Sequence, residues 1–259
     1  MPPTLRLDLN CDMGELVEPD RLALEERIMP LVTSVSIACG FHAGNPGLMR
    51  RTIRLARAHG VAVGAHPGFC DTEGFGRREL SVKPEEVENL IAYQVGALAG
   101  IAALDGVRLQ HVKPHGALYS MAARDRTLAE AIARAVAKLD RRLILFGLAG
   151  SALVEAGRIM GLTVAEEAFM DRAYQADGTL VPRDRAGALI LDEKEVSQRV
   201  RHLALEGVLA GLDGSLVRLR ADTVCLHADT PASDRLAAAV RRELSRAGVR
   251  IVAVGNAEP

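Results

Sequence analysis

The chain has 259 residues, of which 49% are hydrophobic and 25% charged, a composition typical of a globular protein with a substantial core. Its net charge of −1 and its 3% aromatic content do not favour a polyanionic partner, so we expect no nucleic-acid binding and no membrane association. No apolar run approaches the roughly 18 residues of a membrane span, and residues 1–10 lack the pattern of a signal peptide. We therefore expect a cytoplasmic protein, one domain over residues 1–259, whose four cysteines are reduced thiols.

Short apolar segments alternate along the chain with longer segments in which apolar residues recur at helical spacing. The pattern predicts strands at residues 5–10, 34–39, 61–66, 108–113, 142–147, 162–169, 222–228 and 249–254. It predicts helices at residues 23–32, 46–60, 83–106, 127–140, 151–161, 193–211 and 232–248. Asn45 and Pro46 suit the cap and the first position of the second helix, where free backbone amides attract an anion.

The regular order of strand and helix predicts a parallel sheet. Seven such repeats favour a closed β/α barrel over a doubly wound sheet, and no G-x-G-x-x-G follows the first strand to support a dinucleotide-binding fold. Residues 174–190 are rich in Gly, Pro and charge, and they are too long for an ordinary connection in a barrel. We expect this segment to pass over the mouth of the barrel.

Polar side chains gather where the predicted strands end. In a β/α barrel the carboxyl ends of the strands meet at one mouth, and the loops that follow them build the active site. The strand ends carry Asp12, Glu15, His42, His66, Lys113, His115, Tyr119, Asp171, Arg172, His227 and Asp229. We therefore expect these side chains to share one site.

The histidines are unevenly distributed, because five of the seven lie in or beside the strand ends. His111 lies inside a predicted strand, and we expect it to be structural. His59 and His202 lie in predicted helices and are expected at the surface. Function is favoured for the remaining group, taken together rather than singly. That group is His42, His66, His115 and His227.

The residue types at this mouth leave several chemistries open. Asp and His ligands can hold a divalent metal that activates water. The metal candidates are Asp12, His42, His66 and His115. Lys113 suits polarisation of a carbonyl or binding of an anion, and Asp12 or Asp171 could act as general base. The sequence contains no H-E-x-x-H, no P-loop and no G-x-S-x-G, so metalloprotease, P-loop and serine-hydrolase chemistries are not indicated.

Longer motifs run through the same chain: DLNCDMGE, SVSIACGFHAGNP, GAHPGF, GFGRREL, LQHVKPHGALY, DRAYQADGTLVPR, GALI and HADTP. In this order, from about residue 5 to 254, they resemble the family of 5-oxoprolinase A subunits, also called the LamB/YcsF or lactam-utilisation family. The resemblance implies a distorted seven-stranded β/α barrel, similar to that of glycoside hydrolases and polysaccharide deacetylases. It also implies an enzyme that opens the lactam of 5-oxo-L-proline to L-glutamate while hydrolysing ATP to ADP and phosphate, together with subunits B and C.

Phosphorylation of a lactam oxygen by ATP requires cations or amides for the phosphate and an acid/base near the ring. On this view the expected catalytic residues are Asp12, His42, His66, Lys113, His115 and Asp171. The expected substrate or phosphate contacts are Glu15, Asn45, Tyr119, Arg172, Arg183, His227 and Asp229. Two features depart from the family pattern: the segment LVEPDRLALEERIMP after Glu15 is shortened, and Ala228 stands where Gly is more usual. The shortened segment bears on substrate and partner docking more than on fold.

Two other functions fit the same residues. A stand-alone, metal-dependent amide hydrolase or deacetylase would act on another lactam or N-acyl substrate, with a divalent ion near Asp12 and the histidines. A non-catalytic subunit would only hold the lactam. Metal content separates the first two functions. For the third, substitution of Asp12 or His115 should weaken lactam binding in parallel with any loss of turnover.

Overall fold

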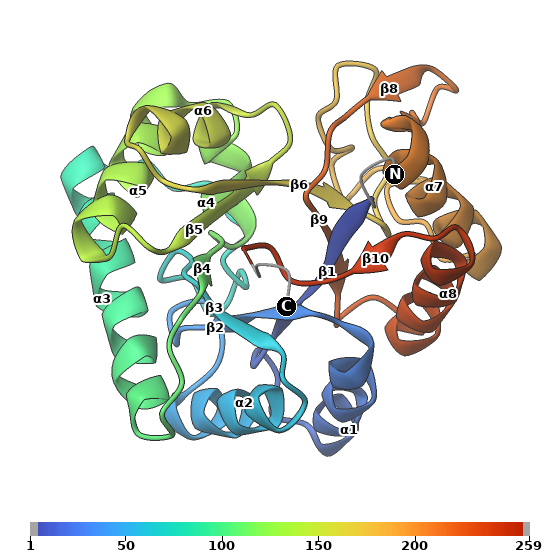
Figure 1. The fold of residues 1–259 in the computed structure, drawn as a ribbon. Coiled ribbons are helices and arrows are strands. Elements are labelled where there is room, and N and C mark those ends of the chain that lie inside the picture. The colour runs from blue at the N-terminus through green and yellow to red at the C-terminus, as the bar shows by residue number, and fades with distance from the viewer. Residues whose placement is uncertain (1–4, 256–259) are drawn as a thin grey trace.

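The structure is a computed structural model that describes residues 5–255. Within this range, seven parallel strands close on themselves into a barrel surrounded by helices (Figure 1). The ring closes because β1 pairs with β2 on one side and with β9 on the other, and β6 also pairs with β9. In order around the ring the strands are β1 (Arg6–Met13), β2 (Ser34–Ala38), β3 (Ala62–His66), β4 (His111–Val112), β5 (Ile144–Leu148), β6 (Val164–Phe169) and β9 (Thr223–His227).

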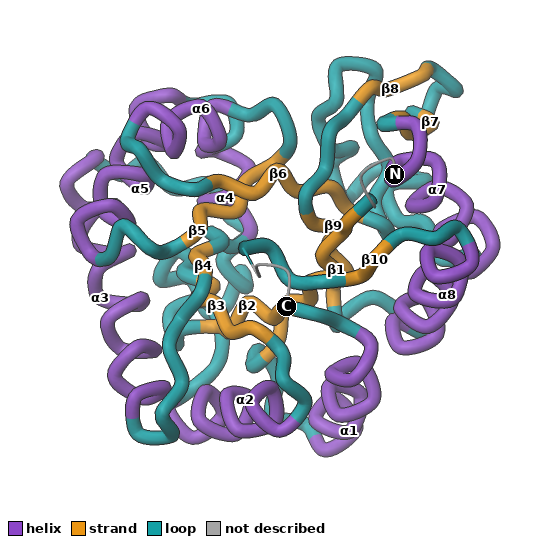
Figure 2. The backbone as a smooth tube through the Cα atoms, in the orientation of Figure 1, coloured by secondary structure: helices purple, strands orange, loops and turns teal. Residues whose placement is uncertain are grey.

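Helices lie around the outside of this ring, and Figure 2 shows them as an outer layer about the central strands. They are α1 (Pro19–Ile28), α2 (Pro46–Ala58), α3 (Pro84–Ala103), α4 (Gly116–Ala122), α5 (Arg126–Leu139), α6 (Ala152–Ile159), α7 (Glu193–Glu206) and α8 (Ser233–Arg246). The short 3₁₀ helix η1 (Met29–Leu31) follows α1. The arrangement confirms the predicted β/α barrel.

The hydrophobic core lies between the strands and the helices. Val35 and Ile37 of β2 belong to the same buried cluster as Ile53 of α2 and Ile91 of α3. Each such side chain contributes about 1.5–3 kcal/mol when it is fully withdrawn from water. The amphipathic spacing of α2 and α5 directs their apolar faces inward, which is why these helices were predictable.

The inside of the ring is polar. Asn10 on β1 donates hydrogen bonds to Glu167 on β6 (2.9 Å) and to Thr223 on β9 (2.7 Å). Since β1 and β6 are not neighbours in the ring, the first of these contacts crosses its interior. Asp8 of the same strand accepts hydrogen bonds from three hydroxyl groups and is also buried. The polar residues that alternate along β1 therefore face the barrel interior, not solvent.

His111 belongs to this interior. Its Nε2 lies 3.1 Å from the Ser36 hydroxyl, and its ring stacks on Phe146 at 4.2 Å between ring centroids. Burial lowers the pKa of His111 to about 3, so the ring is neutral. This placement agrees with the structural role expected for His111.

Some predicted boundaries were wrong. The helix predicted at 193–211 ends at Glu206, because Gly207 adopts a left-handed conformation (φ 67°) that terminates the helix. The chain continues as β7 (Val208–Ala210), which pairs antiparallel with β8 (Leu216–Arg218). The strand predicted at 249–254 shortens to β10 (Arg250–Ile251), which pairs with the first residues of β1 outside the closed ring.

Candidate active site

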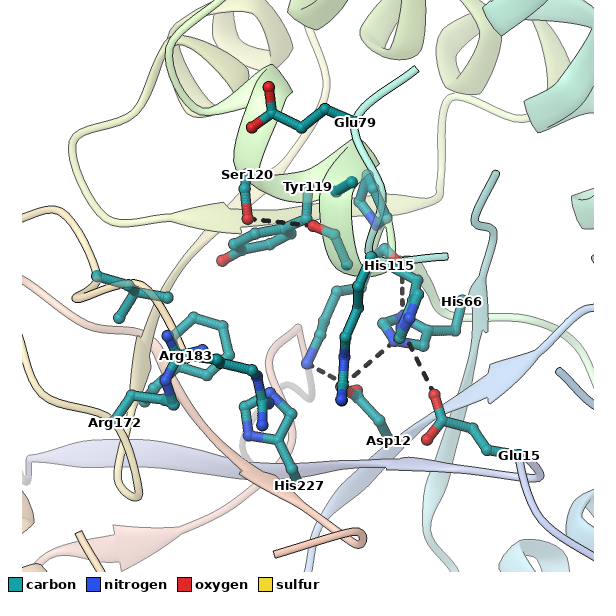
Figure 3. A pocket seen from close by; sticks show the side chains of 17 residues that line it. Asp12, Glu15, His66, Glu79, His115, Tyr119, Ser120, Arg172, Arg183 and His227 are labelled. Carbon is teal, nitrogen blue, oxygen red and sulfur yellow. Dashed lines mark hydrogen bonds and ion pairs between the residues drawn. The ribbon is translucent and has the colours of Figure 1, made fainter. Parts of the chain in front are cut away.

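A cavity of about 230 Å³ lies at the carboxyl ends of the ring strands (Figure 3). Asp12 near the end of β1, His66 at the end of β3 and His227 at the end of β9 all face it. The strand ends therefore converge as expected for a barrel mouth. The sequence-predicted residues that line the cavity are Asp12, Glu15, His66, Lys113, His115, Tyr119, Arg172, Arg183 and His227.

Lys113 is the centre of a buried charge cluster at the floor of the cavity. Its Nζ lies 2.7 Å from Asp12 Oδ1 and 2.9 Å from Glu167 Oε1, and it donates to Asn10 Oδ1 at 3.0 Å. The side chain is only 2% exposed. Burial opposes the ammonium charge, but the Asp12 and Glu167 carboxylates outweigh it and hold the pKa of Lys113 well above its ordinary value.

The same contacts keep Asp12 ionised. Burial alone would raise its pKa, but His66 and Lys113 hold the pKa of Asp12 well below its usual range. Tyr119 donates from its hydroxyl to Glu167 Oε2 at 2.7 Å, and burial raises the pKa of Tyr119 well above its ordinary value. The floor of the cavity thus combines a fixed ammonium group, a carboxylate and a neutral phenol donor.

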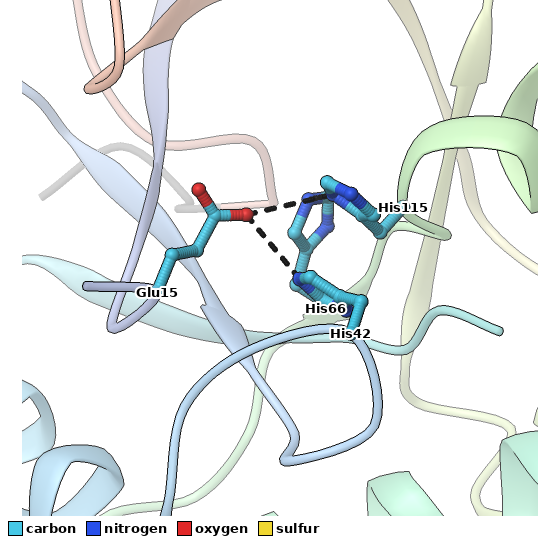
Figure 4. A group of neighbouring side chains, drawn as sticks. All are labelled: Glu15, His42, His66 and His115. Atoms are coloured by element: carbon cyan, nitrogen blue, oxygen red, sulfur yellow. Dashed lines mark hydrogen bonds and ion pairs between the residues drawn. The ribbon is translucent and has the colours of Figure 1, made fainter. Parts of the chain in front are cut away.

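Beside this floor lies the histidine cluster, which we define as Glu15, His42, His66 and His115 (Figure 4). The His42 and His115 rings stack at 3.7 Å between centroids, and His66 Nε2 lies 2.9 Å from His115 Nδ1. Glu15 Oε1 lies 3.3 Å from His42 Nε2 and 3.5 Å from His115 Nδ1. His42 does not line the cavity, whereas His115, on which it stacks, does.

Burial sets the ionisation of this cluster. It lowers the pKa of His42 to about 4 and that of His115 well below the ordinary value, so both rings are neutral at pH 7. Burial also raises the pKa of Glu15 to about 7, against the opposing effect of His66. The segment after β3 closes over the rings. At Gly76 (φ 63°), an added Cβ would lie 2.7 Å from His42 Cβ and 2.9 Å from His115 Cδ2.

Asp171 orients His227, which borders the cavity from the end of β9. Asp171 Oδ2 lies 3.0 Å from His227 Nδ1 and accepts from the Thr230 hydroxyl at 2.6 Å. Burial would raise the pKa of Asp171, but His227 and Thr230 lower it to about 2, so the carboxylate is ionised at pH 7. Asp171 itself does not line the cavity. With Nδ1 donating to Asp171, the Nε2 of His227 is left for acid/base exchange.

Two arginines border the cavity. Arg172 donates to the Val181 carbonyl oxygen at 2.6 Å, and burial lowers its pKa to about 10, which leaves it charged at pH 7. Its Nε is buried and has no hydrogen-bond partner among residues 5–255. Arg183 and Leu180, from the segment 174–190, also line the cavity. The expectation that this segment passes over the mouth is confirmed.

The structure does not bring every predicted residue to the cavity. Asn45, predicted as a substrate or phosphate contact, accepts a hydrogen bond from the Leu48 amide at 3.0 Å and caps α2; it does not line the cavity. Asp229 also lies outside the lining and pairs with Arg77 at 2.7 Å. Sequence reasoning did not single out Arg77, which lines the cavity, although the GFGRREL motif contains it.

The metal candidates fall into two groups, and neither group is the predicted set. Among the described residues, the donor atoms of Glu15, His42, His66 and His115 lie within 4.8 Å of one another. Asp12, predicted as a ligand beside the three histidines, instead falls in a second group with Cys225 and His227. Glu15 therefore takes the place in the cluster that the sequence had suggested for Asp12.

The fold and this cavity define an enzyme of the β/α-barrel class, with a charged and enclosed site at the carboxyl ends of its strands. The chain belongs to the LamB/YcsF family, whose profile matches residues 7–258. It is 51% identical over 249 residues to the 5-oxoprolinase A subunit of Heliobacterium modesticaldum, covering 96% of this chain and 98% of that protein. The family resemblance expected from the motifs is thus confirmed.

Solved structures agree with the fold. The crystal structure of the lactam utilization protein from Thermus thermophilus has a TM-score of 0.88 at 48% identity, covering 96% of this chain and 100% of that chain. The polysaccharide deacetylase Bc1974 from Bacillus cereus has a TM-score of 0.51 at 12% identity, over 98% of this chain and 95% of that chain. The latter similarity concerns fold alone, and it confirms the predicted deacetylase-like barrel.

Among the described residues, no helix has both the length and the apolar character needed to cross a membrane.

Proposed function

We propose that this chain is the A component of a cytoplasmic, ATP-dependent 5-oxoprolinase that works together with subunits B and C. The enzyme opens 5-oxo-L-proline to L-glutamate and hydrolyses ATP to ADP and phosphate. The observation that carries this proposal is the match, at 51% identity over nearly the full length of both chains, to a protein named as a 5-oxoprolinase A subunit. The cavity at the barrel mouth supplies groups suited to this chemistry.

The size of the cavity favours a small substrate. Its volume of about 230 Å³ lies below the range of roughly 300–1,000 Å³ found for drug-sized ligands. One small cyclic amide suits this space, whereas a nucleotide bound beside it does not. We therefore place the lactam inside the cavity and the phosphates of ATP at its rim, near Arg172 and Arg183.

A lactam carbonyl is a poor electrophile, and ATP overcomes this by phosphorylating the carbonyl oxygen as ADP leaves. Water then adds to the activated carbon, the C–N bond breaks as the nitrogen takes a proton, and hydrolysis of the resulting acyl phosphate releases phosphate. We assign the stabilisation of charge on the lactam oxygen to the ammonium group of Lys113. Tyr119, whose hydroxyl donates to Glu167, holds that carboxylate beside Lys113. His227, oriented by Asp171, is placed to exchange the proton.

The proposal is tested with the complex of this chain and subunits B and C from the same organism. We expect glutamate release from 5-oxoproline that requires ATP and all three subunits. Replacing the buried Arg172 in the variant Arg172→Met should raise KM for ATP about tenfold or more, because a charge-assisted hydrogen bond to a phosphate contributes about 1.5–3 kcal/mol. Arg220→Met, at a side chain that is 80% exposed, serves as the matched control and should leave KM unchanged.

The histidine cluster favours one competing function, a metal-dependent amide hydrolase that needs neither ATP nor partners. The same assay separates the two. Turnover of other lactams by the isolated chain without ATP, with no turnover of 5-oxoproline by the complex, would overturn the proposal.

A further inference from the structure

We propose that the histidine cluster, Glu15, His42, His66 and His115, is a binding site for one divalent transition-metal cation of the Zn²⁺ class (Figure 4). This inference does not depend on the substrate or on ATP, since it concerns the ligand chemistry of these four side chains alone.

The hydrogen bonds of two rings fix where their protons lie. His66 Nδ1 lies 2.7 Å from the Lys113 carbonyl oxygen, and His115 Nε2 lies 2.8 Å from the Phe75 carbonyl oxygen. A carbonyl oxygen only accepts, so each of these nitrogens must carry the hydrogen. The other ring nitrogens, His66 Nε2 and His115 Nδ1, are therefore the ones that face the centre of the cluster.

These two nitrogens lie 2.9 Å apart. Two unprotonated nitrogens at this distance would repel each other, so a cation, either a metal ion or a proton, must lie between or beside them. Asp12 Oδ2, 3.3 Å from His66 Nε2, adds negative charge at the same place. Glu15 Oε1 lies 3.5 Å from His115 Nδ1 and 3.3 Å from His42 Nε2, which adds to the electron-rich character of the same small volume. The geometry therefore points to a positive charge at the centre of the cluster.

The surroundings match those of a metal centre. Histidine ligands of metals usually donate their second ring nitrogen to a carbonyl or carboxylate, which fixes the ring orientation. His66 and His115 both do so here, through the carbonyl oxygens of Lys113 and Phe75. Phe75 holds a left-handed backbone (φ 52°), a conformation that costs a non-glycine residue about 1–2 kcal/mol. The backbone is therefore strained at the residue whose carbonyl oxygen orients His115.

The donor set selects the class of cation. Three imidazoles and one carboxylate suit Zn²⁺, Co²⁺ or Ni²⁺, whereas Mg²⁺ and Ca²⁺ prefer oxygen ligands. Asp12 borders this set and is shared with Lys113, since its Oδ2 lies 3.3 Å from His66 Nε2 and its Oδ1 lies 2.7 Å from Lys113 Nζ. Since Glu15, His66 and His115 line the cavity, a bound ion would supply a Lewis acid at its wall.

The test measures metal binding to the purified full chain, without any assay of turnover. After treatment with a chelator and its removal, the protein is titrated with Co²⁺ and with Zn²⁺, and bound metal is counted by elemental analysis after dialysis. We expect about one equivalent per chain, a visible d–d absorption band for Co²⁺, and a rise in Tm on metal addition. His115→Gln and Glu15→Gln should each weaken binding about 100-fold or more, since loss of mere supporting groups already costs 10–100-fold.

Two control variants locate the site. His202→Gln, on the exposed side of α7, and His227→Gln, in the second group of metal donors, should bind metal as the wild type does. The proposal is overturned if the wild-type protein does not bind about one equivalent of metal per chain. The charge at the centre of the cluster would then be a proton shared by His66 and His115. Binding that survives in His115→Gln and Glu15→Gln, or that is lost in His227→Gln alone, would overturn the proposal as well. Circular dichroism of each variant confirms that it is folded.

Discussion

Removal of the buried ammonium group of Lys113 is the sharpest test of the charge cluster in the barrel. In the Lys113→Met variant, a side chain of similar length remains, but Asp12 and Glu167 lose the cation that lies 2.7 and 2.9 Å from them. Both carboxylates are more than nine-tenths buried. The variant therefore leaves uncompensated negative charge inside the ring, which the fold otherwise neutralises.

The expected loss follows from this geometry. Breaking a buried ion pair by removing one partner lowers the free energy of unfolding by about 3–5 kcal/mol. For a chain of this size, that corresponds to a fall in Tm of about 6–20 °C. Adding Glu167→Gln to Lys113→Met removes one of the two stranded charges, so the double variant should recover part of the loss.

Urea unfolding at pH 7 measures both variants. Lys138→Met is the matched control, because Lys138 is 67% exposed and pairs with Glu88 at the surface, where such a pair contributes at most about 1 kcal/mol. A loss below about 1 kcal/mol in Lys113→Met, or no recovery in the double variant, would show that the ammonium group does not neutralise these carboxylates.

Three further outcomes are expected. Asp171→Asn should lower kcat of the complex by about 100-fold or more with little change in KM, because His227 loses the carboxylate that sets its tautomer; an unchanged kcat would remove His227 from the proton exchange. Burial raises the pKa of Asp8 from 3.8 to about 6, so the folded state keeps this proton to a higher pH than the unfolded chain does. The contribution of Asp8 to the free energy of unfolding therefore falls by about 3 kcal/mol as the pH rises from about 4 to 7. Urea unfolding of Asp8→Asn should lack this pH-dependent loss, so the variant gains stability relative to wild type between about pH 4 and 7. A difference in free energy of unfolding that stays constant with pH would contradict the raised pKa of Asp8. Gly76→Ala should lower the free energy of unfolding by about 2–5 kcal/mol, since it combines left-handed strain with a clash. Gly60→Ala, with a similar φ of 66° and nothing within 4 Å, should show the strain of about 1–2 kcal/mol alone, and equal losses in the two variants would refute the close approach at Gly76.

The fold was largely predictable because its signals are local. The period-2 pattern of β1 and the amphipathic pattern of α2, with its Asn45 cap, depend on neighbouring residues along the chain. The hairpin of β7 and β8 was missed because the helical pattern of α7 continues past Gly207, and a glycine alone does not reveal that the following residues pair with a strand.

The sequence predicted which residues form the site better than it predicted which of them contact one another. Strand ends indicated which side chains gather, but the partner of each depends on how the ring closes. Glu167 illustrates this, because it lies in a buried strand and meets Lys113 across the interior at 2.9 Å. Similarly, Glu15 is grouped with all three histidines, whereas Asp12 lies between His66 and Lys113. Asn45 was predicted as a substrate or phosphate contact because a helix start can bind an anion, but Asn45 does not line the cavity.

The pairing of β10 with the start of β1 determines where a tag or a tether can be attached without covering the mouth of the barrel. Arg250 and Ile251 pair with Arg6 and Leu7, at the amino end of β1, whereas the cavity lies at its carboxyl end. β10 and the amino end of β1 therefore lie side by side (Figure 1). Val254, further along the chain, accepts a hydrogen bond from Gln110 just before β4, so both described ends lie at the amino ends of the ring strands, remote from the mouth. A tag, a fluorophore or a tether to a partner protein fixed at either end would leave the mouth open to substrate and to docking partners.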